Sequence, residues 1–89
     1  MAKKTEEQLM QEMEERMHQR ELIESEIRAL VSQLSASSSP IGDWKVIKIY
    51  EARLSNQPDP YDFAALSVAR QNARTRINEL QAQLEQLDD

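Results

Sequence analysis

The stretch "DPYDFAALSVARQNARTRINELQAQLEQL" (Asp59–Leu87) decides the fold class of the chain. Mostly apolar residues recur in it at alternating spacings of three and four, and they are Phe63, Leu66, Arg70, Ala73, Ile77, Leu80, Leu84 and Leu87. This spacing predicts the seam of a coiled coil. With Asp59 as N-cap, Pro60 in the first turn and Asp62 near the positive end of the helix dipole, we expect a helix over about 60–87.

A second long helix is expected before it. The sequence "TEEQ" (residues 5–8) matches a capping box, and no Pro or Gly occurs before Pro40, so the helix should cover about 6–35. Its seam residues, again spaced by four and three, are Leu9, Met13, Ile23, Ile27, Leu30 and Leu34. Because Arg16 and Arg20 occupy the two positions between, only the C-terminal half can bury a continuous stripe.

The N-terminal half of this helix is acidic. Residues 6–15 contain five Glu and no base, and Met10, Met13 and Met17 form a softer stripe among them. With so poor an apolar face, this half either projects into solvent or meets a surface supplied by another chain.

Between the long helices lies a segment that holds the only Trp, the only Gly and all three Pro of the chain. A Ser-rich connector over 35–39 should lead to a short helix over about 40–55 and a turn over 56–59, with Ser39 or Asp43 as the cap. The alternative is a strand at "WKVIKIY" (residues 44–50), but no other segment offers it a partner. A helix places Trp44, Ile47, Tyr50 or Glu51, and Leu54 on one face, and Trp44 should close the turning end.

The 89 residues make one domain at most, and scarce β-branched and aromatic residues favour an all-α class. We expect two long amphipathic helices joined by a short helix, as a helical hairpin or three-helix bundle with a coiled-coil seam. The expected core consists of Ile23, Ile27, Leu30, Leu34, Trp44, Ile47, Phe63, Leu66, Ile77 and Leu80.

Residues suited to catalysis or cofactor binding are scarce. The chain has no Cys, one His and no Gly-rich phosphate loop, so we expect a protein that is not an enzyme and holds no cofactor or metal. Glu15 and His18 have the Glu-x-x-His spacing of di-iron bundles, but the motif occurs once and on the most charged stretch. A solvated His beside Glu neighbours is the simpler interpretation.

Charge and hydropathy indicate the kind of partner. The net charge of -5, from 16 acidic and 11 basic residues, argues against direct nucleic-acid binding and suits a basic protein partner. No unbroken apolar run resembles a signal peptide or membrane span, so we expect a cytoplasmic protein.

Arginines at seam positions carry a second signal. Arg16, Arg20 and Arg70 each cost stability unless a carboxylate meets them, and such residues often determine register or partner choice; alternatively, their stems lie along the seam edge while their heads reach water. The patch of Arg70, Arg74 and Arg76, with Arg53 as a further candidate member, should pair with Glu21, Glu24 or Glu26 of the first helix or of a second chain. The candidate partner-binding residues are Glu7, Met10, Glu14, Met17, Arg70 and Arg74.

At "SPIGDWKVIKIYEARL" and "DPYDFAALSVARQNARTRINELQAQL" the chain resembles small helical proteins encoded by phages and prophages of gut bacteria. The resemblance covers roughly residues 38–84 and brings neither an assigned activity nor site residues. It implies a phage-derived protein that acts in a bacterial cytoplasm. Small acidic phage proteins include inhibitors of bacterial defence nucleases, anti-CRISPR proteins among them.

Two hypotheses about function follow. The first is a non-enzymatic protein–protein interaction module that forms homodimers through its helical seams. The second is an acidic inhibitor that occupies the basic nucleic-acid-binding surface of a defence nuclease. Binding through Glu6 to Glu15 should weaken steeply as ionic strength rises, whereas association through an apolar seam should barely change.

Overall fold

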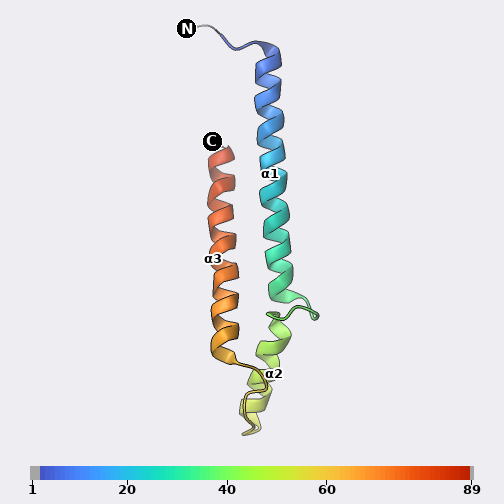
Figure 1. The fold of residues 1–89 in the computed structure, drawn as a ribbon, viewed down its shortest axis with the longest axis vertical. Coiled ribbons are helices and arrows are strands. Elements are labelled where there is room, and N and C mark those ends of the chain that lie inside the picture. Colours follow the sequence, from blue (N-terminus) through green and yellow to red (C-terminus); the bar gives the residue numbers. More distant parts are fainter. Residues whose placement is uncertain (1–2, 89) are drawn as a thin grey trace.

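The computed structural model describes residues 3–88, with side chains up to Leu87, and forms an all-α helical hairpin. The helices are α1 (Glu6–Ser35), α2 (Asp43–Leu54) and α3 (Phe63–Asp88), and no strand occurs within the described residues. α1 and α3 lie side by side and antiparallel, whereas α2 lies beyond the turn (Figure 1). The all-α class and the pairing of the two long helices are therefore confirmed.

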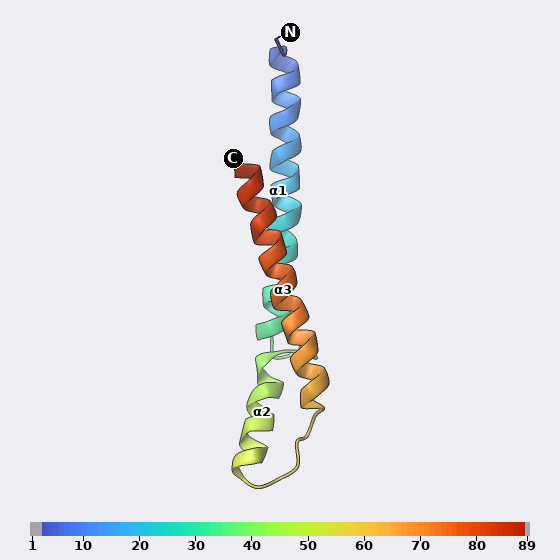
Figure 2. The ribbon, with the colours of Figure 1, turned by 90° about the vertical axis from the view of Figure 1, so that its left-hand side faces the viewer.

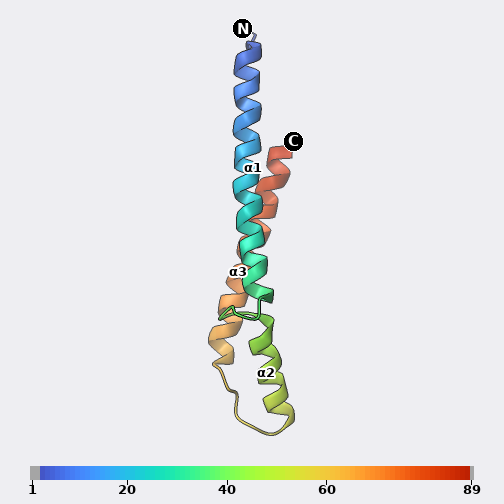
Figure 3. The same cartoon turned by 90° about the vertical axis from the view of Figure 1, so that its right-hand side faces the viewer.

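The molecule is a rod rather than a globule. Its extents are 72 × 21 × 15 Å, and its radius of gyration is 20.2 Å, against roughly 12 Å for a compact domain of this length. Figures 2 and 3 show that α2 runs on past the end of α1, away from the paired helices. The short helix therefore lengthens the hairpin and does not add a third helix alongside the other two.

α1 begins and ends at the residues that its sequence signals indicate. Gln8 N donates to Thr5 Oγ1 at 3.1 Å, and Thr5 N donates to Gln8 Oε1 at 3.0 Å, which completes the capping box. The N-terminal turns of α1 extend past the C-terminal end of α3 (Figure 1). Consequently Met10, Met13 and Met17 are each about 60% exposed.

The seam of α3 is buried where it faces α1 and, at its first turns, the connector and α2. Leu66, Ala73 and Leu80, which are spaced by seven residues, are at most 6% exposed. The residues that alternate with them or face them from α1 are partly buried, and they are Ile23, Ile27, Leu30, Leu34, Ile77 and Leu84. Two helices cover only one side of each other, so the core is a single row of side chains.

The prediction that Ile47 and Phe63 belong to the core is wrong. Phe63 is 41% exposed because it begins α3 beyond the end of α1, and Ile47 is 54% exposed on the outer face of α2. α2 instead buries Ile49, which is 2% exposed, and partly buries Val46. The buried face of α2 is therefore turned relative to the predicted one.

The connector before α2 is built around Ser39, which is buried. Ser39 N donates to the carbonyl oxygen of Ala36, Gly42 N donates to that of Ser39, and Trp44 Nε1 also donates to Ser39 O at 2.7 Å. Because this turn occupies Ser39, the N-cap of α2 is Gly42, so both predicted caps and the predicted start near residue 40 are wrong. Trp44 does lie at the turning end, where its ring packs edge-on against Tyr61 at 5.6 Å.

In the loop between α2 and α3, the predicted N-cap Asp59 does not cap α3. Arg53 Nε and Nη2 donate to the two carboxylate oxygens of Asp59 at 2.9 and 2.8 Å. These hydrogen bonds lower the pKa of Asp59 and engage its carboxylate, so Asp62 caps α3 by accepting from Ala65 N at 3.1 Å. The predicted start of α3 near residue 60 is therefore wrong by three residues, since α3 begins at Phe63.

Leu80→Asp should unfold the hairpin, because Leu80 is 1% exposed at the centre of the α1–α3 contact. Replacing it with a carboxylate loses the burial of a leucine and desolvates a charge, at a cost of more than about 3 kcal/mol. The measurement is thermal unfolding followed by circular dichroism at 222 nm. Val68→Asp is the matched control, because Val68 is 61% exposed on the same helix and should tolerate the change. An unchanged melting curve for Leu80→Asp would contradict the buried row.

Gly42→Ala should loosen the turn between α1 and α2. A Cβ at this position would overlap the carbonyl oxygen of Ala36 and lie 2.9 Å from Trp44 Cδ1. Because the clash is with backbone, we expect a loss of about 1–3 kcal/mol. Fluorescence of Trp44, the only tryptophan, during urea unfolding measures the effect, and Ser38→Ala in the same connector, at an exposed position, should leave the midpoint unchanged.

Candidate interaction surface

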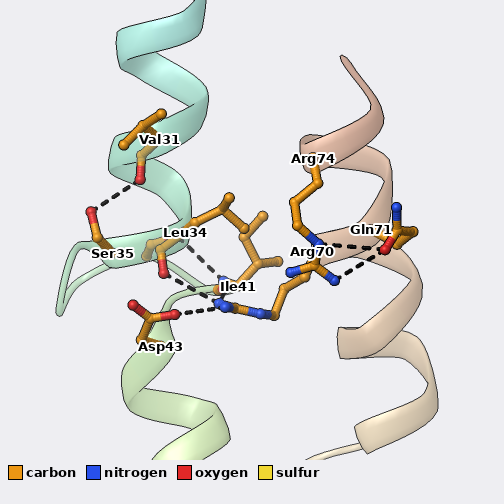
Figure 4. Close-up of polar contacts among 9 residues, drawn as sticks. Val31, Leu34, Ser35, Ile41, Asp43, Arg70, Gln71 and Arg74 are labelled. Carbon is orange, nitrogen blue, oxygen red and sulfur yellow. Dashed lines mark hydrogen bonds and ion pairs between the residues drawn. The ribbon is translucent and has the colours of Figure 1, made fainter. Parts of the chain in front are cut away.

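Arg70 joins three segments of the chain at the turn. Its Nη1 donates to the carbonyl oxygens of Leu34 at 3.2 Å and Ile41 at 2.8 Å, and its Nη2 pairs with Asp43 Oδ1 at 2.6 Å (Figure 4). Its side chain is 15% exposed. Leu34 belongs to the last turn of α1, whose carbonyl groups have no partner within the helix. Arg70 therefore caps α1 and ties it to the start of α2.

These contacts explain how the structure accommodates an arginine at a seam position. A carboxylate does meet Arg70, but it comes from Asp43 of α2 and not from the glutamates of α1. Since both terminal nitrogens of Arg70 are engaged within the chain, its role in the structure is to hold the turn.

Arg76 closes one flank of the α1–α3 seam. Its Nε pairs with Glu26 Oε1 across the two helices at 3.0 Å, and its Nη1 pairs with Glu79 of its own helix at 3.3 Å. The hydrogen bond to Glu26 raises the pKa of Arg76 further above its ordinary value. The predicted pairing of the arginine patch with glutamates of the first helix is thus present at Arg76.

The opposite flank of the seam is left open. Viewed down the axis of α1, Glu26 lies about 80° to one side of the seam and Glu24 about 80° to the other. On α3, Arg76 and Arg74 likewise lie on opposite sides of the seam, each about 80° from it. Because Glu26 and Arg76 meet on one flank, Glu24 and Arg74 belong to the other. Residues spaced by seven share a flank, which places Met10, Met17 and Val31 with Glu24. We call this side of the hairpin the open flank.

Large apolar side chains follow the open flank along α1. Met10 and Met17 are each 60% exposed, and Val31 is 48% exposed. Glu7 and Glu14 are exposed neighbours of the two methionines at helical spacings of three and four. Glu7, Met10, Glu14 and Met17, four of the predicted partner-binding residues, therefore form one ridge on the projecting end of α1.

The far end of the open flank is basic and grooved. Arg74, the remaining predicted residue, contacts Gln71 Oε1 at 3.2 Å, and no carboxylate of the described residues pairs with it (Figure 4). A groove of about 270 Å³ opens beside it and is lined by Val46, Phe63, Leu66, Ser67, Arg70 and Arg74. Its apolar floor and guanidinium rim suit a segment with apolar and acidic side chains.

Sequence reasoning missed Val31 and Phe63 as surface residues. Val31 could have been found, because it lies 14 residues after Met17 and so continues the methionine stripe at heptad spacing. The exposure of Phe63 had no sequence signal, because it depends on where α1 ends relative to α3.

Among residues 3–87, side chains suited to metal chemistry do not gather in one place. Within the described residues, no three or more His, Cys, Asp or Glu are placed to hold a metal ion, and Glu15 and His18 are both exposed. None of the described helices has the length and apolarity needed to cross a membrane. No protein-family model matches the chain, and neither curated proteins nor solved structures give a match.

Arg70→Met should destabilise the hairpin by about 2–3 kcal/mol, because it leaves two carbonyl oxygens and a carboxylate at the turn without their donor. Urea unfolding measures the loss. Arg16→Met is the matched control, since Arg16 also holds a seam position but is exposed on the projecting end of α1, and it should change stability by less than about 0.5 kcal/mol. Equal stability of the two variants would refute the role assigned to Arg70.

Proposed function

We propose that this chain is a non-enzymatic protein–protein interaction module that self-associates through its open flank. The observation that supports this most is the imbalance between buried and exposed apolar side chains. Four hydrophobic residues of the described part are buried, whereas eleven large ones are exposed. Three of the exposed ones, Met10, Met17 and Val31, follow the open flank of α1 beside charged residues, and exposed apolar side chains rimmed by charge are typical of a surface that binds protein.

The energetics of a two-helix hairpin point the same way. Burying one large apolar side chain contributes about 1.5–3 kcal/mol, while ordering each residue costs about 1.5 kcal/mol. A single row of buried side chains leaves little net stability to an isolated hairpin. Covering Met10, Met17 and Val31 against a second chain would add the apolar burial that the monomer lacks.

The setting we propose is the cytoplasm of a bacterium, with the chain derived from a phage. This rests on the resemblance of residues 38–84 to phage and prophage proteins, and the absence of cysteine suits a reducing compartment. In that setting the module would join copies of itself or bind a basic protein.

A second candidate function is inhibition of a defence nuclease. It is favoured by the exposed glutamates of the projecting end, which could occupy a basic nucleic-acid-binding surface. Its test is binding to such a nuclease at rising ionic strength, because contacts made by exposed charges weaken steeply with salt. Binding that is indifferent to salt would exclude this mode of inhibition.

The paired substitution Met10→Gln and Met17→Gln should weaken self-association. Light scattering over a range of concentrations should show the mass of the unaltered protein rising from 10.3 kDa towards twice that value. Losing two apolar contacts in each protomer should raise the dissociation constant at least about tenfold. Leu22→Gln is the control, because Leu22 is 59% exposed but lies off the open flank. A protein that stays monomeric at every concentration would refute the proposed function.

A further inference from the structure

Charge is strongly segregated along the rod. Residues 1–26 and 79–89 carry four bases and twelve acids, a net charge of -8, whereas residues 27–78 carry seven bases and four acids, a net charge of +3. The Glu26–Arg76 pair lies at the boundary between these two regions. The end of the hairpin that contains the chain termini is therefore acidic, and the end that contains the turn is basic.

We infer that two copies pack antiparallel on their open flanks, so that the acidic, methionine-rich ridge of each α1 lies along the basic end of its partner. This inference rests on the proposed function and names the partner and the orientation. A parallel arrangement would place two acidic ends side by side, whereas the antiparallel one brings each acidic end against a basic end. A two-fold axis makes both contacts equivalent, as in most homodimers.

The spacing of the open flank determines the register. Its α1 residues recur every seven positions at Met10, Met17, Glu24 and Val31, with apolar side chains at both ends of the series. A two-fold axis at the middle of the series places Met10 of one protomer against Val31 of the other, twice. The apolar ends of the two ridges then cover each other.

The same register brings opposite charges together. Glu14 of one protomer comes level with Arg28 of its partner, which is exposed one turn before Val31. Arg74 lies at that level on the neighbouring helix, because Arg76 pairs with Glu26 and Arg70 with the carbonyl of Leu34. Each Glu14 carboxylate would thus meet two guanidinium groups. Glu7 would arrive level with Leu34, at the mouth of the groove beside Arg70 and Arg74.

Cysteine cross-linking tests this register in the full chain, which contains no native Cys. The double variant Met10→Cys, Val31→Cys should form a disulfide-linked dimer on mild oxidation. A disulfide within one chain is excluded, because the two positions are about 31 Å apart along one helix. Each single variant should stay uncrosslinked, since like positions lie about as far apart in an antiparallel pair. Leu22→Cys, on another face, is the control for random collision.

The outcomes separate the orientation from the proposed function. A covalent dimer from Met10→Cys alone would indicate a parallel pair and overturn the inference. A dimer by light scattering without any cross-link in the double variant would also overturn it, while leaving self-association intact. If light scattering shows only a monomer, both the antiparallel arrangement and the proposed self-association are refuted.

Charge reversal is the second readout. Arg74→Glu should raise the dissociation constant of the dimer about tenfold, because one pair is lost and a repulsion is gained twice in a symmetric dimer. Because Glu14 faces both arginines, the pair Arg28→Glu and Arg74→Glu should weaken the dimer further, and adding Glu14→Arg to that pair should restore most of the affinity. Lys48→Glu makes the same change of charge on the exposed side of α2 and should leave the affinity unchanged. Failure of Glu14→Arg to restore affinity when both arginines are reversed would contradict the pairing of Glu14 with Arg28 and Arg74.

Discussion

The structure depends on one row of side chains, Leu66, Ala73 and Leu80, that α3 buries against α1 and, at Leu66, against the connector and α2. Because a helix presents one stripe to one neighbour, two helices cannot enclose a core, and each keeps its remaining faces in water. The rod shape, the half-buried isoleucines of α1 and the exposed methionines all follow from this limit. A molecule built this way has apolar surface available along its whole length.

The second constraint is the turn that Arg70 holds. An arginine in the seam interrupts the apolar row where the hairpin must reverse, and there its guanidinium satisfies carbonyl oxygens of Leu34 and Ile41 together with Asp43. A leucine at this position would bury more apolar surface but would leave those groups without a donor. The arginine thus exchanges some packing for a defined end to α1 and a defined start to α2. It also leaves Arg74, one turn further on, as the base that faces outwards.

Repeated and local signals predicted most of the fold, and features that depend on distant segments escaped prediction. The capping box at Thr5 and the heptads of α3 act within a few residues, so they can be recognised in the sequence. Asp59 resembles a cap, but a residue of α2, Arg53, engages it, and only the folded loop shows this. The buried face of α2 was mispredicted because apolar residues surround that short helix, so more than one face fits its pattern. The candidate surface was partly predictable: the methionine ridge stood out by composition, while the position of Arg74 on the same flank required the pairing of Glu26 with Arg76.

The projecting end of α1 links the fold to the proposed function. A hairpin whose only purpose was internal stability would gain nothing from extra turns of α1 that α3 does not cover, because exposed Met contributes little and clustered Glu repel one another. Those turns would contribute to stability if a second surface buried their methionines and paired with their glutamates. The basic end of the same molecule supplies such a surface, with an apolar groove and an outward arginine at the level that an antiparallel copy would reach. The proposed self-association would thus give the uneven charge of the rod a physical explanation, because the acidic end of each copy would lie against the basic end of the other.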